Sequence, residues 1–159
     1  MLINGKIITK NGKKNINDIK VGDSVLSYNE NKNINEYSKV INKFTSTSNS
    51  ILKITFQNEI FEVTKEHPFY NGKKYINASS LQIGDKILSS NGNYYSIIGI
   101  EIIESHKEVY NIEVENNHNY FVGDLGILVH NYGSDSGGSY TDDSGSSDDS
   151  DDDDDWREE

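Results

Sequence analysis

The sequence predicts an all-β protein with one folded domain, and three observations support this prediction. Short runs rich in β-branched and aromatic residues follow one another, turn residues separate them, and no long segment has the period of an amphipathic helix. The chain has 159 residues, enough for one domain with its own hydrophobic core. We therefore expect about ten to twelve short strands and no alternation of helices with strands.

The expected strands follow in order along the first 130 residues. They cover residues 7–9, 21–28, 38–44, 51–56, 60–64, 86–90, 94–103, 109–114 and 119–130. Asn-Gly dipeptides at positions 11–12 and 71–72 are typical of tight hairpin turns, and they mark two further reversals of the chain.

Two parts of the sequence repeat each other. Residues 11–17 (NGKKNIN) return as residues 71–77 (NGKKYIN), and residues 19–27 return in similar form as residues 81–89. A sheet built from one copy alone would leave an apolar face uncovered. We therefore expect two halves that are related by a pseudo-twofold axis and pack on each other, and the period is too long for a solenoid.

The charge is confined to the end of the chain. The formal net charge is -11, and residues 132–159 contain one Arg and twelve of the 26 acidic residues, so residues 1–131 carry 14 charges of each sign. A neutral domain does not favour nucleic acid as a partner. Gly, Ser and Asp dominate the remainder, so we expect a folded domain over 1–131 and a disordered acidic tail over 132–159.

Several classes of function are disfavoured. The chain has no Cys, which excludes disulfides and thiolate chemistry. The histidines lack the short spacing of zinc sites, and the acidic run lacks the spacing of an EF-hand, so we expect no metal and no cofactor. No stretch has membrane-spanning length or the pattern of a signal peptide. We expect a soluble monomer without a membrane partner, in a compartment that the sequence does not define.

The dipeptide His130-Asn131 stands at the border between domain and tail. An asparagine side chain can attack its own main-chain carbonyl, close an imide ring and expel the next residue as a free amine. This step needs proton transfer and a stabilised oxyanion, which neighbouring imidazoles supply. Two other histidines lie in suggestive positions, His67 at a strand end and His118 just before the last expected strand, whereas His106 is expected at the surface.

Five separated motifs give a more specific indication. In chain order they are GDSVLS (22–27), VTKEHPF (63–69), VYNIEV (109–114), NHNYFV (117–122) and VHN (129–131). These motifs resemble the sequence blocks of Hint domains, the fold shared by inteins and the self-processing region of Hedgehog proteins. The resemblance covers residues 1–131 and implies a horseshoe-like, pseudo-symmetric β fold, in agreement with the internal repeat.

The resemblance also implies roles for individual residues. Thr64 and His67 form the Thr-x-x-His motif, which in inteins strains and protonates the amide before the first residue and so assists an acyl shift. Asn131 corresponds to the last intein residue, which cyclises. His130 and His118 correspond to residues that assist cyclisation by proton transfer and by hydrogen bonding to the oxyanion. The substrate implied is the flanking polypeptide of the chain itself.

Three positions depart from the intein pattern, and all three affect splicing. Met1 stands where inteins have a nucleophilic Cys or Ser, and a thioether cannot form an acyl intermediate. Tyr132 stands where splicing needs Cys, Ser or Thr to accept the upstream segment. Asn111 stands where many inteins have an Asp, and its neutral amide cannot act as a base.

These observations leave three hypotheses. The first is a Hint domain that cannot splice but cleaves after Asn131 in a single turnover, which releases residues 132–159. The second is a splicing intein whose original nucleophilic cysteine has been replaced by Met1. The third is a non-catalytic Hint scaffold that presents its acidic tail to a basic partner.

Overall fold

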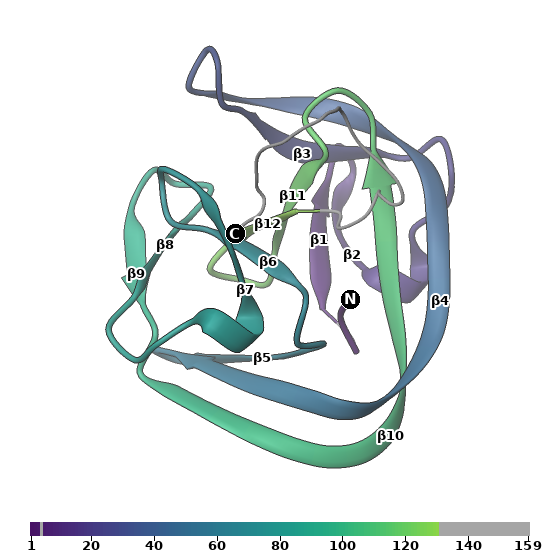
Figure 1. The fold of residues 1–159 in the computed structure, drawn as a ribbon. Helices are drawn as coiled ribbons and strands as arrows, with labels where there is room; N and C mark the ends of the chain where they lie inside the picture. The colour runs from purple at the N-terminus through teal and green to yellow at the C-terminus, as the bar shows by residue number, and fades with distance from the viewer. Residues whose placement is uncertain (4, 131–159) are drawn as a thin grey trace, which may run out of the picture.

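The computed structural model describes residues 1–3 and 5–130, and this part of the chain is nearly all β, as predicted (Figure 1). Its strands are β1 (Lys6–Thr9), β2 (Gly12–Asn15), β3 (Ser24–Asn29), β4 (Ile34–Phe56), β5 (Glu59–Val63), β6 (Pro68–Tyr70), β7 (Tyr75–Asn77), β8 (Lys86–Leu88), β9 (Tyr94–Ser96), β10 (Gly99–Val114), β11 (Asn119–Val122) and β12 (Ile127–His130). Asn131, Tyr132 and the expected acidic tail lie outside the described residues. No helix in the described ranges is long and apolar enough to cross a membrane.

Ten of these strands form one curled sheet. The order along it is β10-β4-β3-β1-β11-β12-β6-β7, with β2 paired to β1 and β5 paired to β4, while β8 and β9 form a separate hairpin. Figure 1 shows β4 and β10 bending together around the outside of the molecule, with the N-terminus inside their curve. The sheet thus curls around the first residues of the chain.

The length of β4 and β10 differs from the sequence expectation. Separate strands were expected over 38–44 and 51–56, but β4 runs through both, because the intervening residues 45–50 (TSTSNS) keep pairing with β10. Their polarity predicts a loop, whereas the threonines among them suit an exposed strand. Separate strands were also expected over 94–103 and 109–114, but β10 runs from Gly99 to Val114 with only a register shift between Glu104 and Lys107, and residues 94–96 form the separate strand β9.

Two further boundaries correct the prediction. Residues 119–130 are not one strand but the hairpin β11–β12, in which Asn119 pairs with His130 and Val122 pairs with Ile127. The turn contains Gly123 at φ 79°, a conformation that glycine adopts without steric cost. Residues 21–23 belong to a turn rather than to a strand, so β3 begins at Ser24.

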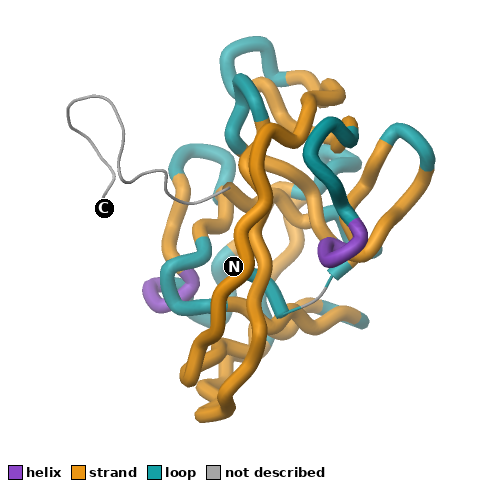
Figure 2. The backbone as a smooth tube through the Cα atoms, turned by 90° about the vertical axis from the view of Figure 1, so that its right-hand side faces the viewer, coloured by secondary structure: helices purple, strands orange, loops and turns teal. Residues whose placement is uncertain are grey.

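The internal repeat is visible in the hydrogen bonds. In each copy a short hairpin leads into a 3-10 helix and then into a glycine turn. The two helices are η1 (Ile16–Asp18) and η2 (Ala78–Ser80), and Figure 2 shows them on opposite sides of the molecule. Gly22 at φ 99° donates its N–H to the Val40 carbonyl at 2.8 Å, and Gly84 at φ 98° donates to the Ile97 carbonyl at 2.8 Å. The two copies therefore share one local structure, as predicted.

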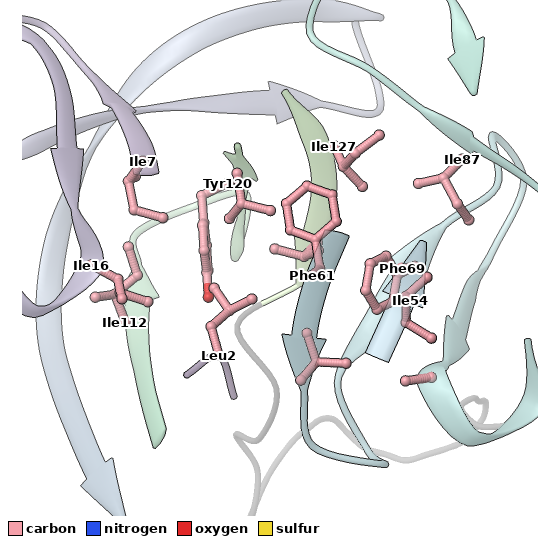
Figure 3. Close-up of a cluster of buried hydrophobic side chains, with 14 of the residues drawn as sticks. Leu2, Ile7, Ile16, Ile54, Phe61, Phe69, Ile87, Ile112, Tyr120 and Ile127 are labelled. Atoms are coloured by element: carbon pink, nitrogen blue, oxygen red, sulfur yellow. The ribbon is translucent and has the colours of Figure 1, made fainter. Parts of the chain in front are cut away.

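The core fills the inside of the curled sheet and joins the two copies. Its buried side chains include those labelled in Figure 3: Leu2, Ile7, Ile16, Ile54, Phe61, Phe69, Ile87, Ile112, Tyr120 and Ile127. Ile16 comes from the first copy and Ile87 from the second, so neither half covers its apolar face alone. The fully buried Leu2 ties the N-terminus to this core.

Candidate functional site

The first residue is held in the centre of the sheet by main-chain contacts. Leu2 forms β-bridges to both β5 and β10, and its side chain is fully buried. The Met1 carbonyl accepts a hydrogen bond from the Thr64 N–H at 2.9 Å. As a result, the Met1 main-chain nitrogen lies 2.9 Å from the Thr64 hydroxyl and 2.9 Å from His67 Nδ1. The structure thus brings the Thr-x-x-His motif onto the nitrogen of residue 1.

His67 is fully buried and electrically neutral. Burial lowers the pKa of His67 well below its ordinary value, and the charge of the N-terminal amine and the nearby His130 act in the same direction. When Nδ1 accepts the hydrogen bond from Met1, the ring hydrogen lies on Nε2. This buried Nε2 has no hydrogen-bond partner among the described residues. One ring nitrogen of His67 therefore contacts the Met1 nitrogen, and the other forms no hydrogen bond with the described residues.

His118 and His130 come together at the end of the β11–β12 hairpin. Their ring centroids are 6.3 Å apart, with a tilt of 43° between the planes. His130 ends β12 and is followed in the sequence by Asn131, while His118 directly precedes Asn119, the cross-strand partner of His130. The two imidazoles therefore lie together at the strand end that precedes Asn131 in the sequence.

The two histidines have different electrostatic surroundings. Burial lowers the pKa of His130 to about 3, and the neighbouring His118 acts in the same direction. Burial also lowers the pKa of His118, but Glu113 and a hydrogen bond with the Val114 main chain oppose that shift. At neutral pH His130 is a neutral imidazole, which can donate or accept a hydrogen bond but holds no spare proton. His118 is the more readily protonated of the pair.

His118 occupies an unusual backbone conformation. Its φ is +57°, in the left-handed region that non-glycine residues rarely adopt, and Asn116 two residues earlier has φ +66°. The side-chain amide of Asn117 anchors this turn, because it donates to the Ser27 hydroxyl and to Glu36 Oε2, both at 2.9 Å. The turn is thereby fixed to β3 and β4, and His118 is presented from a constrained loop end.

Asn111 lies in β10, directly after Tyr110, which forms a β-bridge with Leu2. It is buried, and its Oδ1 accepts hydrogen bonds from the Tyr120 hydroxyl at 2.8 Å and from the Ile112 N–H at 3.0 Å. Met1, Thr64 and Asn111 contribute to the lining of a cavity of about 540 Å³. Three of the candidate residues at the N-terminal position therefore line one space.

The sequence reasoning did not identify two residues beside the histidine pair. Tyr75 contacts the His130 ring, with centroids 4.7 Å apart and an angle of 67° between the planes. The fully buried Asn119 donates a hydrogen bond to the Tyr75 hydroxyl at 3.0 Å. One signal was present: the repeated heptapeptide has Tyr75 where the first copy has Asn15, its single difference. His106, expected at the surface, is exposed in β10 beside Asn49.

A curled, internally repeated β fold with a Thr-x-x-His motif on residue 1 and a histidine pair at the end of the last hairpin is the arrangement of a Hint domain. The family model of the pretoxin HINT domain matches residues 6–132, so the chain belongs to the pretoxin Hint family.

Solved structures agree with this assignment. An intein-like domain from Clostridium thermocellum is 31% identical with a TM-score of 0.78, over 82% of this chain and 97% of that one. The gp41-1 intein is 31% identical with a TM-score of 0.68, over 80% of this chain and 94% of that one. A DnaB intein from Synechocystis sp. PCC 6803, 18% identical over 83% of this chain and 97% of that one, shares the fold with a TM-score of 0.74. These similarities confirm the predicted class and its horseshoe-like β fold.

One curated relative is much longer than this chain. An uncharacterized protein of Methanocaldococcus jannaschii is 28% identical over 141 residues. The match covers 75% of this chain and 20% of the relative, so the chain spans about a fifth of the relative's length. The roles of individual residues in this chain stay predictions.

Proposed function

We propose that this Hint domain cleaves its own polypeptide after Asn131 and does not splice. The observation that carries the proposal is the pairing of His118 with His130, 6.3 Å apart, at the strand end that directly precedes Asn131 in the sequence. Chain connectivity puts the scissile bond only one residue beyond His130. The two imidazoles can therefore serve the proton transfers of asparagine cyclisation.

The proposed reaction is balanced without water or a cofactor. Asn131 Nδ2 attacks the main-chain carbonyl carbon of Asn131, the new C–N bond closes a succinimide, and the bond to the nitrogen of Tyr132 breaks. One proton leaves the side-chain amide, and one proton is delivered to the departing amine. Acid–base groups held within reach of both nitrogens lower the barrier of this exchange.

The surroundings of the two histidines suggest a division of roles. Because burial holds the pKa of His130 at about 3, its neutral ring suits hydrogen-bond donation to the developing oxyanion. His118, which is the more easily protonated, suits the transfer of the proton from the amide to the leaving amine. The name of the family, pretoxin HINT domain, refers to a toxin precursor and agrees with a domain that processes its own chain.

Intact-mass measurement of the purified chain tests this proposal. Cyclisation yields two fragments whose masses add up to that of the intact chain, whereas hydrolysis adds one water to the sum. We expect fragments 1–131 and 132–159 in the parent and none in Asn131→Ala. His118→Ala and His130→Ala should slow cleavage by at least about tenfold, while His106→Ala is the matched control. An unbroken parent chain that behaves like Asn131→Ala would favour the non-catalytic scaffold with an acidic tail for a basic partner.

A second candidate function is that of a splicing intein inactivated at its first residue. The observation that favours it is the Met1 nitrogen, which Thr64 and His67 hold at 2.9 Å each. The test is a Met1→Cys variant fused to an upstream segment and treated with a thiol. Release of that segment, and its loss in the additional variant His67→Ala, would support this candidate. A folded Met1→Cys chain that releases nothing would remove it.

A further inference from the structure

Three contacts join Tyr75, Asn119 and His130 into a closed set. Asn119 and His130 are cross-strand partners in the β11–β12 hairpin. The Asn119 side chain donates to the Tyr75 hydroxyl at 3.0 Å. The Tyr75 ring meets the His130 ring at 4.7 Å between centroids. Each member is thus held by the other two, and the set ends on the imidazole next to Asn131.

Asn119 is fixed from a second direction. It is fully buried, and its amide forms two hydrogen bonds with the main chain of Tyr28 in β3, one received from the Tyr28 N–H at 2.8 Å and one donated to the Tyr28 carbonyl at 3.0 Å. With these two bonds, the bond to Tyr75 fills the donor capacity of the amide. The side chain of Asn119 therefore has one orientation available.

Tyr75 is also held at both ends of its side chain. Its hydroxyl donates to Glu30 Oε2 at 2.8 Å, in addition to accepting from Asn119. Its ring packs on Tyr70 at 4.7 Å between centroids. Figure 1 shows β12, β6 and β7 side by side. Tyr75 lies at the start of β7, and its ring contacts His130 at the end of β12. The edge contact between the rings of Tyr75 and His130 is therefore made by a side chain with little freedom.

We infer that Tyr75 is a positioning residue for His130: its anchored ring fixes the orientation of the imidazole and keeps water from one side of it. This inference rests on the proposed function, in which His130 donates a hydrogen bond from a dry site. The titratable groups near His130 include His118, His67 and Tyr75, and the Tyr75 ring lies nearer to it, at 4.7 Å between centroids, than the His118 ring at 6.3 Å. A fixed, desolvated donor is the form in which an oxyanion stabiliser is most effective.

The structural part of the inference is tested in a chain that cannot cleave. In the Asn131→Ala background, NMR resonances of the His130 ring are followed against pH in the parent, in Tyr75→Phe and in Tyr75→Leu. We expect contacts between the rings of residue 75 and His130 in the parent and in Tyr75→Phe. In Tyr75→Leu, the midpoint of the His130 titration should rise by at least about one pH unit as water reaches the imidazole. A folded Tyr75→Leu chain with an unchanged His130 titration would overturn the inference.

The functional part is tested in the cleaving chain. Tyr75→Leu should slow cleavage by about tenfold or more and change its pH profile, whereas Tyr75→Phe should retain most of the rate because the ring remains. Tyr95→Leu, a tyrosine of β9 whose hydroxyl contacts Asn91, is the control for general damage. If the parent does not cleave, the proposed function fails, and the NMR titration still decides whether Tyr75 positions His130. Equal rates in the parent and in a folded Tyr75→Leu chain would overturn the positioning role.

Discussion

Lowering the pH from about 6.5 to about 4.5 should destabilise this fold, because buried neutral histidines resist protonation. Burial lowers the pKa of His67 well below its ordinary value of 6.5. Burial also lowers the pKa of His130 from the same ordinary value to about 3. Between the folded and unfolded pKa values, the unfolded chain binds more protons than the folded chain. The free energy of unfolding therefore rises with pH in this window. The part of it that the buried neutral histidines contribute is fully present above pH 6.5 and is lost as the pH falls towards the folded pKa.

The size of the effect follows from linkage. Each pH unit over which unfolded His130 holds one proton more than folded His130 costs about 1.4 kcal/mol of stability. With a folded pKa of about 3, the loss between pH 6.5 and pH 4.5 is about 2 kcal/mol for His130 alone. His67 adds a loss of the same sign. Together these losses are a large fraction of the roughly 5–15 kcal/mol by which ordinary domains are stable.

Urea unfolding at a series of pH values measures this dependence. The chain should carry Asn131→Ala so that it stays in one piece, and the comparison is between this parent and the same chain with His130→Gln. We expect the parent to lose about 2 kcal/mol more than His130→Gln between the two pH values. The Met1 amine, with its pKa lowered by burial to about 5, contributes equally to both chains when it is free. Identical pH dependences in the two chains would refute the reasoning.

Three further outcomes are expected. Asn117→Ala removes two hydrogen bonds beneath the turn of His118; it should cost about 1–3 kcal/mol in urea unfolding and slow cleavage, and an unchanged cleavage rate would show that the turn does not orient His118. Gly22→Ala and Gly84→Ala should each lower the free energy of unfolding by on the order of 1 kcal/mol, because both glycines have φ near +99°. No atom lies within 4 Å of an added Cβ at either position, so clearly unequal losses in urea unfolding would contradict the shared local structure. Tyr120→Phe leaves a buried acceptor with one partner fewer and should cost about 1–3 kcal/mol by thermal or urea unfolding.

The sequence was most informative where the structure depends on short-range patterns. The β-type runs predicted most strand positions, and the repeated heptapeptide predicted two equivalent turns, because an Asn-Gly turn and a glycine with positive φ are determined by neighbouring residues. The extent of β4 was predicted less well. Residues 45–50 are polar and look like a loop, but pairing with β10 keeps them in a strand. Such tertiary pairing overrides local preference.

The candidate site was predicted only in part, because contacts between distant parts of the chain do not appear in local sequence patterns. Thr64 and His67 lie three residues apart and were identified as a pair, and the structure brings both to Met1. The contact of Tyr75 with Asn119 joins residues 44 positions apart, and the repeat marks position 75 as different without indicating that it meets Asn119. Contacts of this kind depend on which strands become neighbours, which the sequence does not state directly.

Two features that cost this fold stability, both at histidines, argue for a chemical role at these positions rather than a scaffold role. A buried donor without a partner, as at His67 Nε2 among the described residues, costs about 1–3 kcal/mol. The left-handed conformation of His118 costs on the order of 1 kcal/mol more. A scaffold needs neither, since an apolar side chain at position 67 and a glycine or asparagine at position 118 would fit more favourably. Both costs fall on imidazoles, one beside Met1 and one beside His130, which is the distribution expected of a site arranged for proton transfer.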